Sequence, residues 1–151
     1  MARGKYSGFE MIENSFERLG RDSIRRIVEA GAKACAGKMQ DEIQKNRHVR
    51  TGSMMQNVKP ERYREFLGGG AMEVYPQDTD ARGVSNTVKA YVINHGIGRN
   101  PTVRSRGRKE RNRTGDKFIT GNKTAMEQVV RQAMQEENNR IISESGGNKN
   151  G

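Results

Sequence analysis

Apolar residues recur at helical spacing near the start of the chain. Their steps of three, four and three predict a short N-terminal helix, whose apolar positions are Phe9, Ile12, Phe16 and Leu19. Ser7 can cap this helix, and Gly20 stands where a helix commonly ends. We expect Phe9, Ile12 and Phe16 to dock on a neighbouring subunit; the alternative is that they pack on their own subunit.

A second and longer helical pattern begins at Asp22 and is predicted to run to about Asn46. Its apolar face consists of Ile24, Ile27, Val28, Gly31, Ala34, Cys35, Met39 and Ile43. Small side chains are concentrated there, at Ala30, Gly31, Ala34, Cys35 and Ala36, with Gly37 beside them. Small residues allow close approach of another element. We expect the helix to lie on a sheet of its own subunit; a contact between subunits is the alternative.

Beyond the long helix the pattern changes to strands. Residues 71–75 alternate polar and apolar side chains up to Pro76, and residues 87–93 are rich in β-branched residues. They predict an antiparallel pair joined by a polar turn over 77–83. The region around Val58 stays open between a strand and a short helix over 60–64.

The remaining segments complete the order of elements. Gly68, Gly69 and Gly70 predict a flexible break, and Thr124 is expected to cap a last helix that reaches Ile141 and Ile142. The apolar positions of this helix are Ala125, Met126, Val129, Val130, Ala133 and Met134.

This order predicts an α+β fold in which a long N-terminal helix and a C-terminal helix pack on a small antiparallel β-sheet. We expect an N-terminal helical arm over 1–20, a core domain over 21–142 with a basic loop at 97–117, and a disordered tail over 143–151.

Composition limits the core and the class of protein. Leu, Ile, Val and Phe together number 25 of 151 residues, so the core is thin for a chain of this length. No apolar run is long enough for a membrane span, and the N-terminal pattern does not fit a signal peptide. The single cysteine, Cys35, cannot form an internal disulfide, which suits a reducing compartment.

Positive charge is concentrated in one segment. The chain has a net charge of +10, of which residues 99–123 contribute +7. The basic residues of the expected loop are Arg99, Arg104, Arg106, Arg108, Lys109, Arg111 and Arg113. A block of this kind favours a polyanion or an acidic protein face as partner, and a solvated loop without a partner is the alternative. We expect the loop to be mobile until an anionic partner orders it.

Signals for catalysis or cofactor binding are weak. His48 and His95 are too few for most metal sites, and Cys35 is not part of a paired ligand motif. Residues 115–124 lack the spacing of a phosphate-binding loop. Residues 97–117 contain no aromatic side chain to stack on bases, so charge alone would give non-specific, salt-dependent binding of nucleic acid. We therefore expect neither an enzyme nor a cofactor or metal.

Three segments resemble one known family. Residues 50–58 (RTGSMMQNV) follow the long helix, residues 74–84 (VYPQDTDARGV) come next, and residues 89–96 (KAYVINHG) complete the order. These segments are similar to those of bacteriophage tail-completion or head–tail joining proteins, the small neck proteins of long-tailed phages. The similarity covers about residues 20–140. The Arg-rich stretch 102–116 departs from the family pattern as an insertion.

The resemblance implies structural roles for ten residues, which are Thr51, Gly52, Met55, Tyr75, Pro76, Gly83, Tyr91, Gly96, Phe118 and Ala125. Thr51 would cap a turn, Gly52 would supply a positive φ and Gly96 would end a strand.

The function that the resemblance implies is that of a non-enzymatic virion protein at the neck. It would form a homo-oligomeric ring with phage connector and tail proteins as partners, with DNA in the channel as a further partner and no membrane contact. Its expected location is the virion, and the host cytoplasm during assembly. The alternative is a small nucleic-acid-binding protein that acts through the basic loop.

Overall fold

The computed structural model describes residues 8–46, 52–67, 69–97 and 113–146, and the side chains of 20–46, 52–67, 69–96 and 115–145. The expectations for Thr51, for the apolar side chains between Phe9 and Leu19, and for the tail after Gly146 fall outside these residues.

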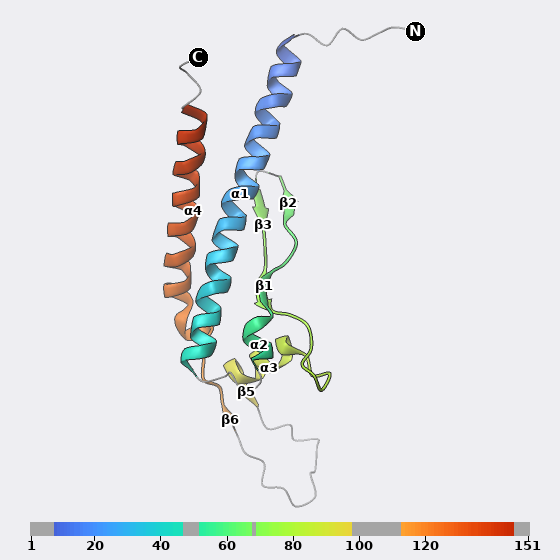
Figure 1. The fold of residues 1–151 in the computed structure, drawn as a ribbon, viewed down its shortest axis with the longest axis vertical. Coiled ribbons are helices and arrows are strands. Elements are labelled where there is room, and N and C mark those ends of the chain that lie inside the picture. Colours follow the sequence, from blue (N-terminus) through green and yellow to red (C-terminus); the bar gives the residue numbers. More distant parts are fainter. Residues whose placement is uncertain (1–7, 47–51, 68, 98–112, 147–151) are drawn as a thin grey trace, which may run out of the picture.

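Two long antiparallel helices form the frame of the molecule (Figure 1). Helix α1 spans Gly8–Lys45 and helix α4 spans Lys123–Gly146. The predicted helix from Asp22 to about Asn46 is confirmed. The predicted end at Gly20 is wrong, because α1 runs through this residue without a break. A glycine in a helix interior lowers helix stability by only about 1 kcal/mol relative to alanine, which is too little to end a long helix.

Helix α4 differs from its prediction at both ends. A single 3₁₀ turn, η1 (Thr120–Asn122), leads directly into α4 at Lys123, so Thr124 lies inside the helix and does not cap it. The helix also includes Ser143–Gly146, which were predicted to belong to a disordered tail.

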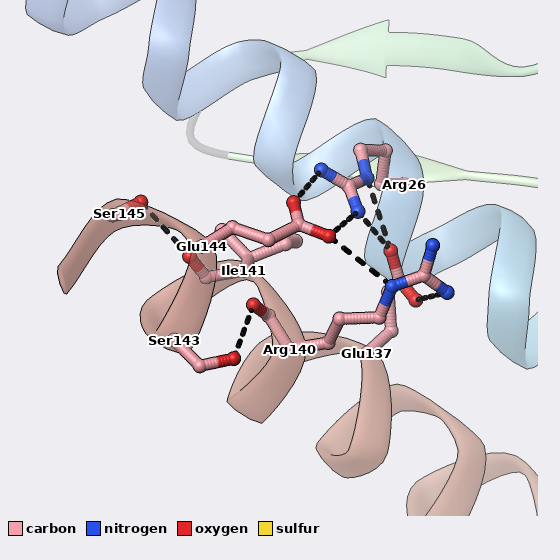
Figure 2. Close-up of polar contacts among 7 residues, drawn as sticks. All are labelled: Arg26, Glu137, Arg140, Ile141, Ser143, Glu144 and Ser145. Carbon is pink, nitrogen blue, oxygen red and sulfur yellow. Dashed lines mark hydrogen bonds and ion pairs between the residues drawn. The ribbon is translucent and has the colours of Figure 1, made fainter. Parts of the chain in front are cut away.

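An ion-pair cluster explains why the end of α4 stays helical (Figure 2). Arg26 of α1 donates through Nε to Glu137 at 3.0 Å and through Nη1 to Glu144 at 2.9 Å. Arg140 donates to the same Glu144 carboxylate at 3.2 Å. These hydrogen bonds, that from Arg26 first, lower the pKa of Glu144. The last turn of α4 is thereby tied to α1.

At Gly31 the small-residue face of α1 meets α4, while the helix also lies along the strands of its own chain, as expected. A Cβ on Gly31 would lie 2.7 Å from Cγ of Met134 and 3.2 Å from Cγ1 of Val130. Ala36, another small residue of α1, lies in the core together with Val58 of the strand that follows. Gly31 and Ala36 therefore serve packing within the same chain.

The strands form one long interrupted hairpin beside α1 (Figure 1). Strand β1 (Val58–Pro60) pairs with β4 (Val74–Pro76), and strand β2 (Arg64–Phe66) pairs with β3 (Gly69–Ala71), both antiparallel. Between the two ladders three residues (61–63) face two (72–73), as in a bulge.

Several strand predictions need correction. Of the two alternatives at Val58 the strand is present, and residues 60–64 form no helix. The single strand predicted over 71–75 is divided between β3 and β4. Gly69 and Gly70 lie in β3, so the flexible break predicted there is wrong.

The largest error concerns residues 87–93, which form helix α3 (Asn86–His95) and not a strand. Its buried residues, Asn86, Ala90 and Asn94, follow a step of four, whereas Val88 and Tyr91 are exposed. The caps at Ser85 and Gly96 favour a helix here, although the β-branched residues favour a strand. Helix α2 (Ser53–Gln56) and the short strands β5 (Gly96–Ile97) and β6 (Arg113–Thr114) complete the fold.

The core lies at the end of the molecule where α1 finishes. Its members come from α1, α2, β1, α3, the approach to η1, and α4, and are Ala36, Met39, Ile43, Met54, Val58, Ala90, Phe118 and Met126. Two long helices packed with small antiparallel ladders confirm the α+β class.

Candidate interaction site at the base of the basic segment

The basic segment leaves the core and returns to it at one place. Strand β5 pairs antiparallel with β6, so that Gly96 faces Thr114 and Ile97 faces Arg113. Of the predicted contact residues, Arg113 alone has its backbone within the described chain. The other predicted contact residues fall outside the described chain, and they are Arg99, Arg104, Arg106, Arg108, Lys109 and Arg111. The expected mobility of this loop likewise falls outside the described residues.

Helix α3 leads directly into this base. Ser85 caps the helix, since its hydroxyl accepts from the Val88 N–H at 3.4 Å. Gly96 ends it with φ +82°, and its N–H donates to the Val92 carbonyl. Gly96 therefore ends a helix, and not the strand that the resemblance implied, and the same residue begins β5.

Asn94 fixes the return of the chain. Its side chain is almost fully buried, and its Oδ1 accepts hydrogen bonds from the N–H groups of Ile119 and Thr120 at 2.9 and 3.2 Å. Its backbone carbonyl accepts from the N–H of Lys117 at 3.1 Å, and that of Ile93 accepts from Asp116 at 2.8 Å. Four hydrogen bonds thus hold residues 116–120 against the end of α3.

Close packing adds to these hydrogen bonds. A Cβ on Gly115 would overlap the carbonyl oxygen of Asn94 and the backbone of His95, so glycine is required there. Phe118, three residues later, is 1% exposed and lies in the core. The base of the basic segment is therefore anchored in the core.

Glu42 joins the same region to α1. Its side chain is 4% exposed, with Nζ of Lys38 at 3.0 Å. Asn122 of η1 donates to the Glu42 carboxylate at 3.0 Å and to the Phe118 carbonyl at 2.9 Å. Because the buried charge is paired and hydrogen-bonded, it is stably accommodated.

A second buried polar centre surrounds Asn86, at the start of α3. Its Nδ2 donates to Oγ of Ser53 at 3.1 Å and to the carbonyl of Gln77 at 2.9 Å. Asn86 is fully buried, so these bonds connect α2, β4 and α3 at the residues that enter or leave each element.

The turn over 77–85 is held by Asp80. Its Oδ1 accepts from the N–H groups of Arg82 and Val84 at 2.9 Å each, and Lys89 of α3 contacts its Oδ2 at 2.5 Å. The bond from Lys89, followed by those from the backbone, lowers the pKa of Asp80 to about 2. The carboxylate therefore stays charged throughout the neutral range.

The structure places the glycines and the proline of the family motif at turns and in the core. Gly52 precedes α2 with φ +68°, which agrees with the role implied for it, and Gly83 has φ +76° in the Asp80 turn. Pro76 is fully buried in β4. These residues are required for backbone conformation or for packing, and none of them carries a reactive group.

The other motif residues are spread over different environments. Met55 packs beside the core, Ala125 is half-buried in the first turn of α4, and Tyr91 is exposed with its ring 4.5 Å from that of His95. The hydroxyl of Tyr75 donates to Glu61 at 2.5 Å, which lowers the pKa of Glu61. The fold does not gather these residues into one pocket.

Sequence reasoning missed the residues that build this site, namely Asn94, Asn86, Asp80, Gly115 and Glu42. One signal was available: Ser85 and Gly96 enclose residues 86–95 as an N-cap and a C-terminal glycine enclose a helix. Cys35 of α1, half-buried beside α4, has its pKa raised by burial, which favours the neutral thiol.

Comparison with known proteins gives no relative for this chain. No protein-family model matches it, and neither a curated protein nor a solved structure is similar to it. Within the described residues, no helix is long and apolar enough to cross a membrane, and no three His, Cys, Asp or Glu side chains are grouped to hold a metal ion.

Proposed function

We propose that this chain is a structural, non-enzymatic protein of a phage or prophage virion, which acts in tail completion at the head–tail junction. In this role it assembles as a homo-oligomer between connector and tail proteins.

The proposal is carried by the positions of the motif residues. Gly52, Gly83 and Gly96 adopt positive φ, while Pro76 and Phe118 are buried. These residues serve turns and core packing, which indicates a shared architecture, and none of them carries a reactive group. Such residues suit a family defined by assembly.

The distribution of apolar residues supports assembly as well. Among the described residues, the buried apolar cluster lies at one end of the molecule, while large apolar side chains such as Phe66, Leu67 and Tyr91 are more than half exposed. A subunit that exposes apolar surface of this kind gains stability when neighbours cover it.

The test is deletion of the gene from the phage or lysogen that encodes it. We expect DNA-filled heads and separate tails in electron micrographs, and joined particles when the gene is returned on a plasmid. A gene located among portal, connector and tail genes agrees with the proposal. Joined, infectious particles in the deletion strain would contradict it.

One observation favours a second candidate, a small basic nucleic-acid-binding protein. The β5–β6 ladder presents the Arg-rich segment from a single anchored base, and its excess positive charge is suited to phosphate contacts. The salt dependence of DNA binding, described in the Discussion, tests this candidate.

A further inference from the structure

An exposed apolar groove lies between α1 and the β2–β3 hairpin, away from the core. Leu67, at the tip of the β2–β3 hairpin, is fully exposed, Phe66 is 58% exposed and Ile24 of α1 is 36% exposed. Together with Tyr63 and Gly20 they line an open groove of about 700 Å³ between α1 and the hairpin. Three large apolar side chains are thus exposed in one place.

The helices around the groove have few buried side chains. No described side chain of α1 from Gly20 to Ala30 is buried, and the same holds for α4 from Glu127 to Ser145. The apolar groove therefore does not continue an internal core and opens to its surroundings.

The N-terminal arm of α1 (residues 8–19) extends beyond the groove. Figure 1 shows the first turns of α1 rising beyond both the last residue of α4 and the β2–β3 hairpin, so no described element of the chain runs alongside them. By their spacing, Phe9, Ile12 and Phe16 share one face of this arm with Leu19.

The arm cannot enter the groove of its own chain. One wall of the groove is α1 itself, at Gly20, Arg21 and Ile24, and the arm is the direct continuation of that wall. Because the helix is unbroken through Gly20, the arm points away from the groove and could fold back only if α1 broke at this wall. The occupant has to come from another molecule.

We infer that the N-terminal arm of one chain docks in the apolar groove of a second copy, with its apolar face against Ile24, Phe66 and Leu67. Apolar residues at helical spacing are what a hydrophobic groove accepts from a docking helix. Charge does not oppose this partner, since the arm carries Glu10, Glu13 and Glu17 against the single Arg18, while Arg21 and Glu65 balance each other in the lining of the groove.

An arm that docks in a groove joins two different surfaces. Contacts of this kind are heterologous, and they generate a ring when the rotation closes. The inference deepens the proposed function, on which it rests for ring closure, and it names the contact by which the copies associate.

Disulfide trapping tests the contact. In a Cys35→Ser background, one chain carries Ile12→Cys and a second carries Leu67→Cys, and the two are mixed under mild oxidation. Cys35 is the single native cysteine, so each variant carries one cysteine and a disulfide can form only between two chains. We expect a cross-linked heterodimer that links the two variants.

The matched control replaces Leu67→Cys by Gln135→Cys, an exposed position on α4. The inference is overturned if the Ile12–Leu67 product does not exceed this control. It is also overturned if only Leu67→Cys homodimers form, which would indicate a symmetric hairpin contact, or if only Ile12→Cys homodimers form, which would indicate pairing of arms.

Sedimentation gives a second measurement. Replacing Phe66 and Leu67 by Ser should weaken self-association at least tenfold, whereas Val88→Ser, at an exposed apolar position on α3, should leave it unchanged. If the deletion strain makes unjoined heads and tails but no cross-link forms, the proposed function stands and the arm contact falls. If a specific cross-link forms but the deletion strain makes normal particles, the arm contact stands and the proposed function falls.

Discussion

Gly31 of α1 lies so close to Met134 of α4 that a Cβ on the glycine would be 2.7 Å from the methionine Cγ. Gly37 and Gly20, on the same helix, have nothing within 4 Å of such a Cβ. Alanine substitutions at the three glycines therefore distinguish the effect of helix propensity on stability from the effect of packing between helices.

The first prediction uses this contrast. Gly37→Ala should raise the free energy of unfolding by about 0.5–1 kcal/mol, because alanine favours a helix interior. The free energy of unfolding of the Gly31→Ala variant should be about 1–3 kcal/mol lower than that of the Gly37→Ala variant, because overpacking usually costs this much. Urea unfolding measures both, and Met134→Ala should partly rescue Gly31→Ala. Equal effects of the two alanines would show that α1 and α4 are not in close contact at Gly31.

The second prediction concerns the continuity of α1. Because Gly20 is helical and in open space, Gly20→Ala should stabilise the protein by about 0.5–1 kcal/mol, as Gly37→Ala does. If the helix ended at Gly20 in a left-handed conformation, alanine would instead destabilise it. Urea unfolding and helical content by circular dichroism distinguish the two results.

The third prediction concerns the anchor at Asn94. Asn94→Ala leaves the N–H groups of Ile119 and Thr120 without their acceptor, and should lower the free energy of unfolding by about 1–3 kcal/mol. Amide hydrogen exchange at residues 116–120 should speed up as well. Asn139→Ala, at an exposed position of α4, is the control and should change stability by less than about 0.5 kcal/mol. A neutral Asn94→Ala would contradict the anchor.

The fourth prediction concerns acid stability. The pKa of Asp80 is about 2 in the folded chain and ordinarily 3.8, so the unfolded chain binds the proton more readily. The stabilisation by this carboxylate is complete above about pH 4 and is lost as the pH falls through about 2. Asp80→Asn should therefore lower the melting temperature at pH 5, and the difference from the parent should vanish near pH 2.

The control for the acid series is Asp78→Asn. Asp78 pairs with Lys59 at 2.9 Å, but its side chain is 56% exposed, so the pair contributes little. Its melting curve should follow the parent over the whole pH series. A constant difference between Asp80→Asn and the parent from pH 5 to pH 2 would refute the assigned pKa.

The fifth prediction tests the basic segment. Replacing Arg104, Arg106, Arg108 and Arg111 by Ser should leave the fold intact, because none of them belongs to an apolar face. If the segment binds duplex DNA, the slope of log K against log salt should become shallower by about 0.9 for every phosphate that the variant no longer neutralises. Fluorescence anisotropy over a salt series measures this slope.

A charge-matched variant serves as its control, with the exposed residues Lys33, Arg62, Arg82 and Arg131 replaced by Ser. Equal slopes for the two variants would mean that the segment makes no specific contribution. A segment variant that binds DNA and builds joined particles like the parent would show that its charge has no role in either process.

The long helices could be predicted because their apolar period extends over many turns. Helix α3 could not be, since Val88, Val92 and Ile93 favour a strand locally, while the caps at Ser85 and Gly96 and the burial of Ala90 decide for a helix. Local propensity is weak, and tertiary contacts override it in a ten-residue element.

The candidate site was only partly predictable, for a different reason. The basic residues are visible in the sequence as a run of charge. The anchor depends on pairs that are distant along the chain, such as Asn94 with Ile119 and Glu42 with Asn122, and no periodicity signals them. The exposed tip at Leu67 was likewise invisible, since one leucine beside three glycines indicates only a turn.

The ladder between β5 and β6 has a consequence for engineering the protein. Because the ends of the Arg-rich segment are already held together, its length is nearly independent of the rest of the fold. Doubling a flexible loop costs only about 0.6 kcal/mol in closure entropy. The chain should therefore accept a fluorescent protein or an affinity tag spliced between Ile97 and Arg113, which would give a label for locating each copy within an assembled particle.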